Sequence, residues 1–204
     1  MRIIGLTGGI ACGKSAVSAM LKARGAVIVD GDRISHSLTA PGGPALAPLR
    51  EAFGDGVFHP DGSLNRRLLG QLVFSDGAAL QRLNSVMRPL LRREIRREIA
   101  EATAAQAPVC VLDMPLLFEE RLDRLCRSVW CVFLPERIQL RRLMERDGLS
   151  EAEARSRIAS QLPLSEKAAR STRILDNSGS LAELENLVEE AWQSELREEA
   201  EKHE

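Results

Sequence analysis

Apolar and polar residues alternate in blocks along the chain, and the blocks predict strands separated by helices. The apolar run of residues 3–6 suits a strand buried in a parallel sheet, and residues 15–24 carry apolar side chains at helical spacing. Gly25 ends that helix, and a second apolar run follows over residues 26–29. Because parallel strands need a crossover between them, this order predicts the start of a parallel sheet.

Later blocks predict three more strands and the helices that connect them. The expected strands span residues 109–113, 128–134 and 173–177. One helix is expected over residues 136–146 and another from Leu181 onwards, and residues 195–204 are expected to form a solvated charged tail. Residues 149–170 form a charged, alanine-rich helical stretch that Pro163 breaks. This pattern is typical of a mobile lid rather than of a core element.

The middle of the chain has a different pattern. Glycines and prolines repeatedly interrupt weak helical patterns between Pro41 and Gly62, which predicts the start of an inserted subdomain. Helices are then expected over residues 66–74, 78–86 and 89–105.

The last of these helices carries arginines within a limited arc of its surface. They are Arg88, Arg92, Arg93, Arg96 and Arg97. Three interpretations are open: solvation with Glu94 and Glu98 as helix partners, a clamp for substrate phosphates, and RNA binding. The chain has 3% aromatic residues and no tyrosine, which disfavours RNA because RNA sites usually combine basic surfaces with stacking platforms.

Composition narrows the class of protein. The 204 residues have a net charge of −1 and a pI of about 6.4, so no overall basic field attracts nucleic acid or an anionic membrane. The four cysteines form no Cys-x-x-Cys pair, which is typical of reduced thiols. Because the chain shows no signal-like start and no run near ~18 apolar residues, we expect a cytoplasmic, single-domain protein that binds neither membrane nor nucleic acid.

Residues 8–15 have the sequence Gly-Gly-Ile-Ala-Cys-Gly-Lys-Ser and directly follow the first predicted strand. Gly8 and Gly13 let the backbone turn its N–H groups toward a phosphate, Lys14 supplies a positive charge, and Ser15 offers a hydroxyl to Mg²⁺. The helix that follows directs the positive end of its dipole at the same anion. The pattern therefore predicts a phosphate-binding loop, although several enzyme classes share such a loop.

A kinase for a small hydroxyl compound also needs a carboxylate near that hydroxyl, and Asp32 is the candidate. It follows the second predicted strand, at the edge of the sheet where nucleotides bind. Asp30 or Asp32 could instead cap the next helix, and capping does not exclude the catalytic role. Asp113 ends another predicted strand, where a carboxylate could orient water on Mg²⁺.

Positive charge for a transferring phosphoryl group is expected from Arg142 and Arg146. They lie four residues apart on the helix that enters the predicted lid, so both can point to one face. A solvated helix face is the alternative interpretation.

The chain resembles the dephospho-CoA kinase family over nearly its whole length. The resemblance consists of Leu6-Thr7-Gly8-Gly9-Ile10 leading into Gly13-Lys14-Ser15, Asp30-Gly31-Asp32 where the family usually has Asp-Ala-Asp, Phe53-Gly54, residues 61–66 before Leu69 and Val73-Phe74, Leu83-Asn84, Pro115-Leu116-Leu117-Phe118-Glu119, Gln139 with Arg142, Arg146-Asp147, Ala154, Arg157 and Gln161, and Asp176-Asn177-Ser178-Gly179. The order and spacing of these segments are jointly specific.

The resemblance implies a P-loop kinase fold of three layers in one α/β domain. Its core would comprise residues 1–40, 106–139 and 171–204, with a helical substrate region over about 41–105 and a lid over about 140–170. It also implies ATP-dependent phosphorylation of the ribose 3′-hydroxyl of dephospho-CoA with Mg²⁺, by a monomer or weak homo-oligomer.

Site residues also follow from the resemblance. Asp32 would be the general base, Lys14, Arg142 and Arg146 would stabilise phosphoryl charge, and Ser15 would hold Mg²⁺. The residues implied for ATP are Gly8, Gly9, Ile10, Ala11, Cys12, Gly13, Lys14, Ser15, Ala16 and, near the adenine, Asn177. The residues implied for dephospho-CoA are Asp32, Arg66, Leu116, Leu117 and Phe118, of which the last three are equally compatible with ordinary core packing.

The chain departs from the family pattern at two places. Arg88-Pro89 stands where the family commonly has His-Pro, and His36 stands where it commonly has arginine. Arg88 could hold a phosphate through its charged fork, whereas His36 is either an exposed helix residue or a substitute ligand. The competing functions are a nucleoside or nucleotide kinase of the same architecture and a GTPase-like switch, but the chain lacks the Asn-Lys-x-Asp segment that reads guanine.

Overall fold

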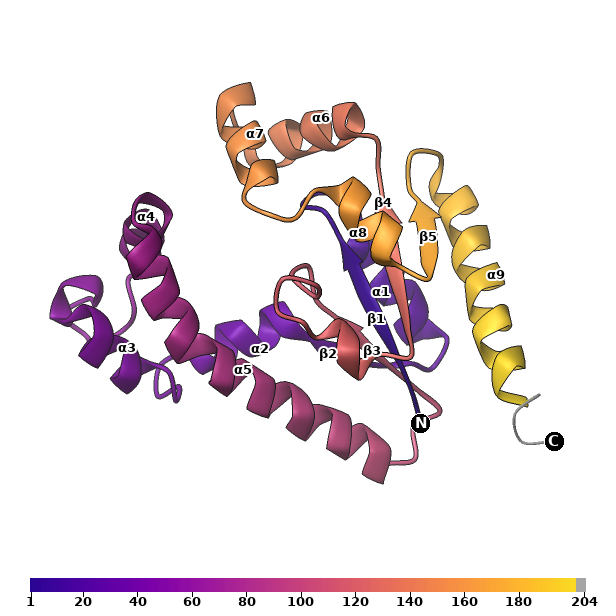
Figure 1. Cartoon of the computed structure of the whole chain (residues 1–204), viewed down its shortest axis with the longest axis horizontal. Coiled ribbons are helices and arrows are strands. Elements are labelled where there is room, and N and C mark those ends of the chain that lie inside the picture. Colours follow the sequence, from indigo (N-terminus) through magenta and orange to yellow (C-terminus); the bar gives the residue numbers. More distant parts are fainter. Residues whose placement is uncertain (201–204) are drawn as a thin grey trace. The chain divides into compact units, whose positions relative to one another are not determined.

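The computed structural model describes residues 1–200, except for the side chains of Phe74, Ser75 and residues 198–200. Figure 1 shows the chain as a ribbon. It folds into two compact units, one formed by Met1–Val29 with the chain from Ala102 onwards, the other by Asp30–Glu101. No helix within residues 1–200 is both long and apolar enough to cross a bilayer.

The first unit is built on a five-stranded sheet. Its strands are β1 (Arg2–Gly8), β2 (Val27–Asp30), β3 (Val109–Asp113), β4 (Ser128–Phe133) and β5 (Arg173–Asp176), in the order β2-β3-β1-β4-β5. The pairs β1–β3, β1–β4 and β4–β5 run parallel, and the register places Leu6 beside Asp113 and Gly8 beside Val132. The expected α/β fold with a parallel sheet is confirmed, and the segment that follows β1 leaves from the centre of the sheet.

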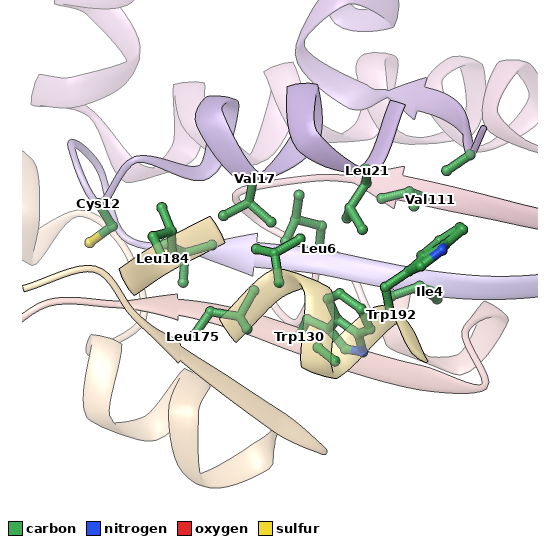
Figure 2. Packing of buried hydrophobic residues seen from close by; sticks show 14 of the residues in the cluster. Ile4, Leu6, Cys12, Val17, Leu21, Val111, Trp130, Leu175, Leu184 and Trp192 are labelled. Carbon is green, nitrogen blue, oxygen red and sulfur yellow. The ribbon is translucent and has the colours of Figure 1, made fainter. Parts of the chain in front are cut away.

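One face of the sheet packs against α1 (Lys14–Ala23) and α9 (Leu181–Ala200). Figure 2 shows Val17 and Leu21 of α1, Leu184 and Trp192 of α9, and the strand residues Ile4, Leu6, Val111, Trp130 and Leu175 in one buried cluster. Full burial of such side chains stabilises a protein by ~1.5–3 kcal/mol each. This packing anchors α1, and with it the loop that precedes α1.

The opposite face is covered by residues 114–127, which include a short 3-10 helix η2 (Asp123–Leu125), and by α8 (Leu164–Arg170). The chain approaches β1 closely there, because a Cβ on Gly5 would lie 2.7 Å from Leu117 Cδ2 and 2.9 Å from Cys126 Sγ. Only glycine fits this position without a shift of its neighbours. Helices and loops on both faces give the three layers expected from the sequence.

The region predicted as a lid contains most of α6 (Glu136–Asp147), all of α7 (Glu151–Ala159) and also α8, which packs on the sheet. Gly148 ends α6 in the left-handed region at φ 66°. Ser150 caps α7 through a reciprocal pair of hydrogen bonds with Glu153, which explains why a new helix begins there. The break expected at Pro163 is also present, since α7 ends at Ala159 and α8 begins after Pro163.

The second unit is largely helical. Its elements are α2 (Gly31–Leu38), α3 (Leu46–Phe53), a 3-10 helix η1 (Asp55–Val57), α4 (Arg66–Ser75) and most of α5 (Gly77–Ala104). The prediction of separate helices over 78–86 and 89–105 is wrong, because α5 is continuous with Pro89 inside it. An internal proline costs about 3 kcal/mol, and the burial of side chains on both sides of Pro89, including Ala79 and Ile95, offsets that cost.

The predicted solvated tail over residues 195–204 is also wrong in its first part. Helix α9 continues to Ala200, and Glu195 is 3% exposed because its carboxylate meets the buried guanidinium of Arg2 at 2.9 Å. The partner lies at the other end of the chain, so the local charge pattern does not reveal it. Residues 201–204, which include the end of that tail and of the predicted core, lie outside the described residues.

All four cysteines are free, as expected from their spacing. Burial raises the pKa of Cys12 from 9.0 to about 11, and it raises the pKa values of Cys126 and Cys131 to about 12. Above pH ~9 the unfolded chain releases these protons while the folded chain retains them, so the folded state binds more protons. The free energy of unfolding should therefore fall as the pH rises from about 9 toward 11.

The free energy of unfolding is expected to fall more steeply with rising pH in the natural chain than in a variant with Cys12, Cys126 and Cys131 all replaced by alanine. Each thiol contributes a slope of at most about 1.4 kcal/mol per pH unit. Urea titrations followed by tryptophan fluorescence, at several pH values from about 8 to about 10.5, measure the slope. Lysines titrate equally in both proteins, so equal slopes would contradict the prediction.

Candidate active site

The loop predicted to bind phosphate joins the C-terminal end of the central strand β1 to α1. Gly13 forms the N-terminal cap of α1 in the left-handed region at φ 88°, and Ala11 also has a positive φ of 60°. Positive φ is costly for alanine, and such strain concentrates at functional loops. The Cys12 N–H donates to the Gly9 carbonyl at 3.2 Å, and the Ala16 N–H donates to the Gly13 carbonyl at 3.0 Å.

A side-chain amide from the segment after β5 holds this loop, and an arginine supports that residue in turn. Asn177 Nδ2 donates to the Cys12 carbonyl at 2.9 Å, and Arg142 donates to the Asn177 carbonyl at 3.1 Å. A Cβ on Gly13 would overlap the Asn177 amide nitrogen, so both the backbone conformation and the contact require glycine here. Asn177 thus supports the loop from behind, while its predicted proximity to the adenine of ATP stays a prediction.

Lys14 and Asp113 form an ion pair at the carboxyl ends of β1 and β3. Asp113 is 4% exposed, so its charge depends on the ammonium group for compensation. The sequence suggested that Asp113 could orient water on Mg²⁺, and the structure adds a direct contact with the lysine of the loop. Asp113 thereby holds the Lys14 ammonium at the edge of the sheet where the loop lies.

The residues present fit a magnesium ion that is held mainly by a nucleotide. Within the part of the chain that the structure describes, no three His, Cys, Asp or Glu side chains form a metal cluster. Mg²⁺ often takes one or two protein ligands and fills its other positions with phosphate oxygens and water. Ser15, exposed in the first turn of α1, and the Asp113 carboxylate offer the oxygen groups for this arrangement.

The two predicted lid arginines have different surroundings. Arg142 is half-buried and donates to the carbonyl of Asn177, the residue whose side chain holds the phosphate loop. Arg146 is exposed, and its guanidinium makes two hydrogen bonds to Asp147, at 2.7 and 3.1 Å. This contact lowers the pKa of the Asp147 carboxyl, which also meets Arg157 at 3.0 Å. The structure brings Arg142 to the residue that supports the loop and places Arg146 in an ion-pair cluster at the end of α6.

The segment Pro115–Glu119, here called the acceptor loop, contains the residues predicted to wall the acceptor pocket. Leu117 is fully buried against β1, Phe118 is 4% exposed with the guanidinium of Arg170 over its ring at 4.3 Å, and Leu116 is half-buried. Core packing thus accounts for Leu117 and Phe118 as placed here. Their predicted contact with substrate stays a prediction.

A fully buried lysine holds the acceptor loop. Lys167 of α8 donates to the Pro115 carbonyl at 2.6 Å and meets the Glu119 carboxylate at 2.8 Å, and Thr7 Oγ1 donates to the same carbonyl at 3.0 Å. The Leu162 N–H donates to Glu119 as well, at 3.0 Å. The sequence did not single out Lys167, because its burial depends on how α8 lies on the sheet.

The remaining predicted site residues belong to the second unit. Asp30 accepts the Arg33 N–H at 2.9 Å and is the N-terminal cap of α2, so Asp32 lies in the first turn and is exposed. The alternative that Asp32 is the cap is therefore wrong. Arg66, the first residue of α4, is exposed and donates to the His36 carbonyl at 3.1 Å.

The arginine face of α5 forms ion pairs in part. Arg97 pairs with Glu94 at 2.5 Å and with Glu101, whereas Glu98 pairs with Arg33 of α2 at 2.6 Å. The helix partner expected in Glu94 is confirmed. Glu98 instead connects α5 to α2 within the second unit.

Comparisons with known proteins show what the sequence and the fold of this chain are similar to. A family profile described as dephospho-CoA kinase matches residues 2–183. A curated dephospho-CoA kinase from Symbiobacterium thermophilum is 47% identical over 95% of this chain and 81% of its own length. Among solved structures, TT1252 from Thermus thermophilus has a TM-score of 0.80 at 35% identity, covering 97% of both chains. A dephospho-CoA kinase from Campylobacter jejuni has a TM-score of 0.70 at 25% identity, covering 95% of this chain and 96% of its own.

Proposed function

Because the chain belongs to the dephospho-CoA kinase family, we infer that it transfers the terminal phosphoryl group of ATP to the ribose 3′-hydroxyl of dephospho-CoA. The products are coenzyme A and ADP, and the reaction is the last step of coenzyme A biosynthesis. The observation that carries this conclusion is the family match over residues 2–183, and the left-handed Gly13 between β1 and α1 supports it.

The loop accounts for donor binding. We propose that its backbone N–H groups and the N-terminal end of α1 bind the ATP phosphates, as anion-binding helix termini do. Lys14 would leave Asp113 in part and follow the charge that develops on the transferring group, with Arg142 beside it. Ser15 is proposed as the protein ligand of Mg²⁺, which would neutralise charge on the triphosphate.

The acceptor side of the reaction is assigned to Asp32. In this proposal its carboxylate takes the proton of the 3′-hydroxyl, that oxygen bonds to the γ-phosphorus, and the bond from the γ-phosphorus to ADP breaks in line. Asp32 does not serve as the cap of α2, because Asp30 already caps that helix. Arg66 and the acceptor loop are proposed to bind dephospho-CoA.

The organisation of the molecule around this reaction is also proposed. The helical substrate region over about 41–105 would bind the acceptor, and the lid over about 140–170 would exclude water. The near-neutral net charge of −1 supports a small-molecule enzyme that needs neither nucleic acid nor membrane. We propose a cytoplasmic monomer or weak homo-oligomer.

The function is tested by incubating the purified protein with MgATP and dephospho-CoA and weighing the product by mass spectrometry. Nucleoside monophosphates and shikimate serve as competing acceptors. Asp32→Asn is expected to lower kcat by about 10²-fold and to leave the Kd for ATP nearly unchanged, because it removes the base and keeps the shape.

Asp30→Asn is the matched control, because asparagine caps a helix as well as aspartate does and the change removes a neighbouring charge. It should keep most of the activity. An Asp32→Asn enzyme as active as the natural one would place the base elsewhere, and faster phosphorylation of another acceptor would overturn the substrate assignment.

A further inference from the structure

Two glutamines of the lid region bind the same residue of the phosphate loop. Gln139 Nε2 donates to the Ile10 carbonyl at 2.9 Å, and Gln161 Oε1 accepts the Ile10 N–H at 3.2 Å. Both backbone polar groups of Ile10 are therefore bound by side-chain amides from elsewhere in the chain. Ile10 lies near the tip of the loop, two residues after Gly8 ends β1.

Burial and packing show that this contact is built into the fold. Gln139 is 3% exposed, and a Cβ on Gly9 would overlap its amide nitrogen, so glycine at position 9 makes room for the amide. The side chains of Ile10 and Ala11 pack against an apolar cluster of the lid helices that is centred on Leu143. The tip of the loop is thus bound to the lid region through both its backbone and its side chains.

The two glutamines lie near the two ends of the segment that forms α6 and α7. Gln139 lies on α6, near the start of that segment, and Gln161 lies between α7 and α8, before the chain returns to the sheet with α8. A carbonyl held on the outer side of a tight loop turns with its peptide plane, which limits where the neighbouring N–H groups can point. A fixed set of N–H directions is what a phosphate cradle requires.

We propose that Gln139 and Gln161 are positioning residues that form a bracket around Ile10 and hold the phosphate loop in the shape that binds ATP. Neither glutamine contacts the reacting atoms in this proposal, and each acts through the Ile10 backbone. The proposal rests on the kinase function inferred above and adds the means by which the lid region sets the affinity of the donor site.

The hydrogen-bond directions supply the test, because the two glutamines have opposite roles. Gln161→Glu keeps an oxygen to accept the Ile10 N–H, whereas Gln139→Glu replaces the donor with an oxygen that faces the Ile10 carbonyl oxygen. Both variants add one negative charge near the nucleotide. Gln139→Glu is expected to raise the Kd for MgADP and the KM for ATP about 10-fold more than Gln161→Glu does.

Uncharged variants separate the bracket from the added charge. Gln139→Met and Gln161→Met each remove one hydrogen bond, and each should raise the Kd for MgADP about 10-fold, with the KM for dephospho-CoA within about 2-fold of the natural value. Gln193→Glu, on the exposed side of α9, is the control for charge alone and should behave as the natural protein. Thermal unfolding of each variant verifies that it is folded.

The outcomes distinguish the bracket from the kinase function. Equal effects of the two glutamate variants, or methionine variants that bind MgADP as the natural protein does, would overturn the bracket. A uniform rise in both KM values would indicate general loosening of the fold and would overturn it as well. If no dephospho-CoA is phosphorylated while the asymmetry in MgADP binding persists, the inferred function fails and the bracket stands.

Discussion

Lys14→Met should lower kcat with ATP and dephospho-CoA by on the order of 10³-fold. In the proposed reaction, the ammonium group of this lysine lies at the end of the phosphate loop and stabilises the negative charge that develops on the transferring phosphoryl group. Methionine keeps the length and apolar stem of the side chain but supplies no charge. Steady-state kinetics of ADP release, with the Kd for MgATP measured separately by calorimetry, separate the loss in turnover from weaker binding.

The partner of Lys14 makes a second variant necessary. Without the ammonium group, the nearly buried Asp113 carboxylate loses its compensating charge, which lowers the free energy of unfolding. Lys14→Met with Asp113→Asn removes both charges and is expected to regain stability without regaining activity. Lys22→Met, on the exposed side of the same helix, is the matched control and should stay active. Activity of Lys14→Met within tenfold of the natural enzyme would refute the assignment.

Lys167→Met is expected to lower the free energy of unfolding by about 3–5 kcal/mol. Lys167 is fully buried, and its removal leaves the Glu119 carboxylate without its counter-charge and the Pro115 carbonyl without one of its donors. Denaturant titration followed by tryptophan fluorescence measures the loss. Trp130 and Trp192 suit this purpose because both lie in the core of the same unit (Figure 2).

A double variant tests whether the unpaired charge of Glu119 causes the loss of stability in Lys167→Met. Lys167→Met with Glu119→Gln removes both charges, so it should recover a large part of the stability that Lys167→Met loses. Lys22→Met again serves as the control for loss of a lysine. A loss below about 1 kcal/mol in Lys167→Met, or no recovery in the double variant, would show that the ion pair contributes little to the fold.

The phosphate loop and the order of strands and helices were predictable because their signals are local. Glycines, a lysine and a serine at fixed spacing between an apolar run and a helical pattern specify the loop. Each strand is a short apolar run, and each boundary is marked by a glycine, a proline or a capping residue within a few positions. Such signals survive without tertiary structure because the backbone responds to nearest neighbours.

The two wrong predictions concern features that depend on tertiary packing rather than on local signals. Pro89 predicts a helix boundary from local chemistry, yet packing on both sides keeps α5 continuous. The charged end of the chain predicts solvation, yet Glu195 is buried by a partner 193 residues away. In both cases a contact between distant parts of the chain outweighs a local preference, and such contacts are invisible in the order of residues alone.

The sequence by itself determined that this chain has a phosphate loop on a parallel sheet, and its family resemblance named the reaction. Only the tertiary structure decided that Asp113 holds Lys14, that Lys167 holds the acceptor loop, and that two glutamines bracket Ile10. The residues of that bracket are 129 and 151 positions from Ile10, and the sequence singled them out only as part of the family resemblance, without indicating their partner. Their partners are set by how helices pack on the sheet, because burial forces each polar group to find a hydrogen bond wherever the fold supplies one.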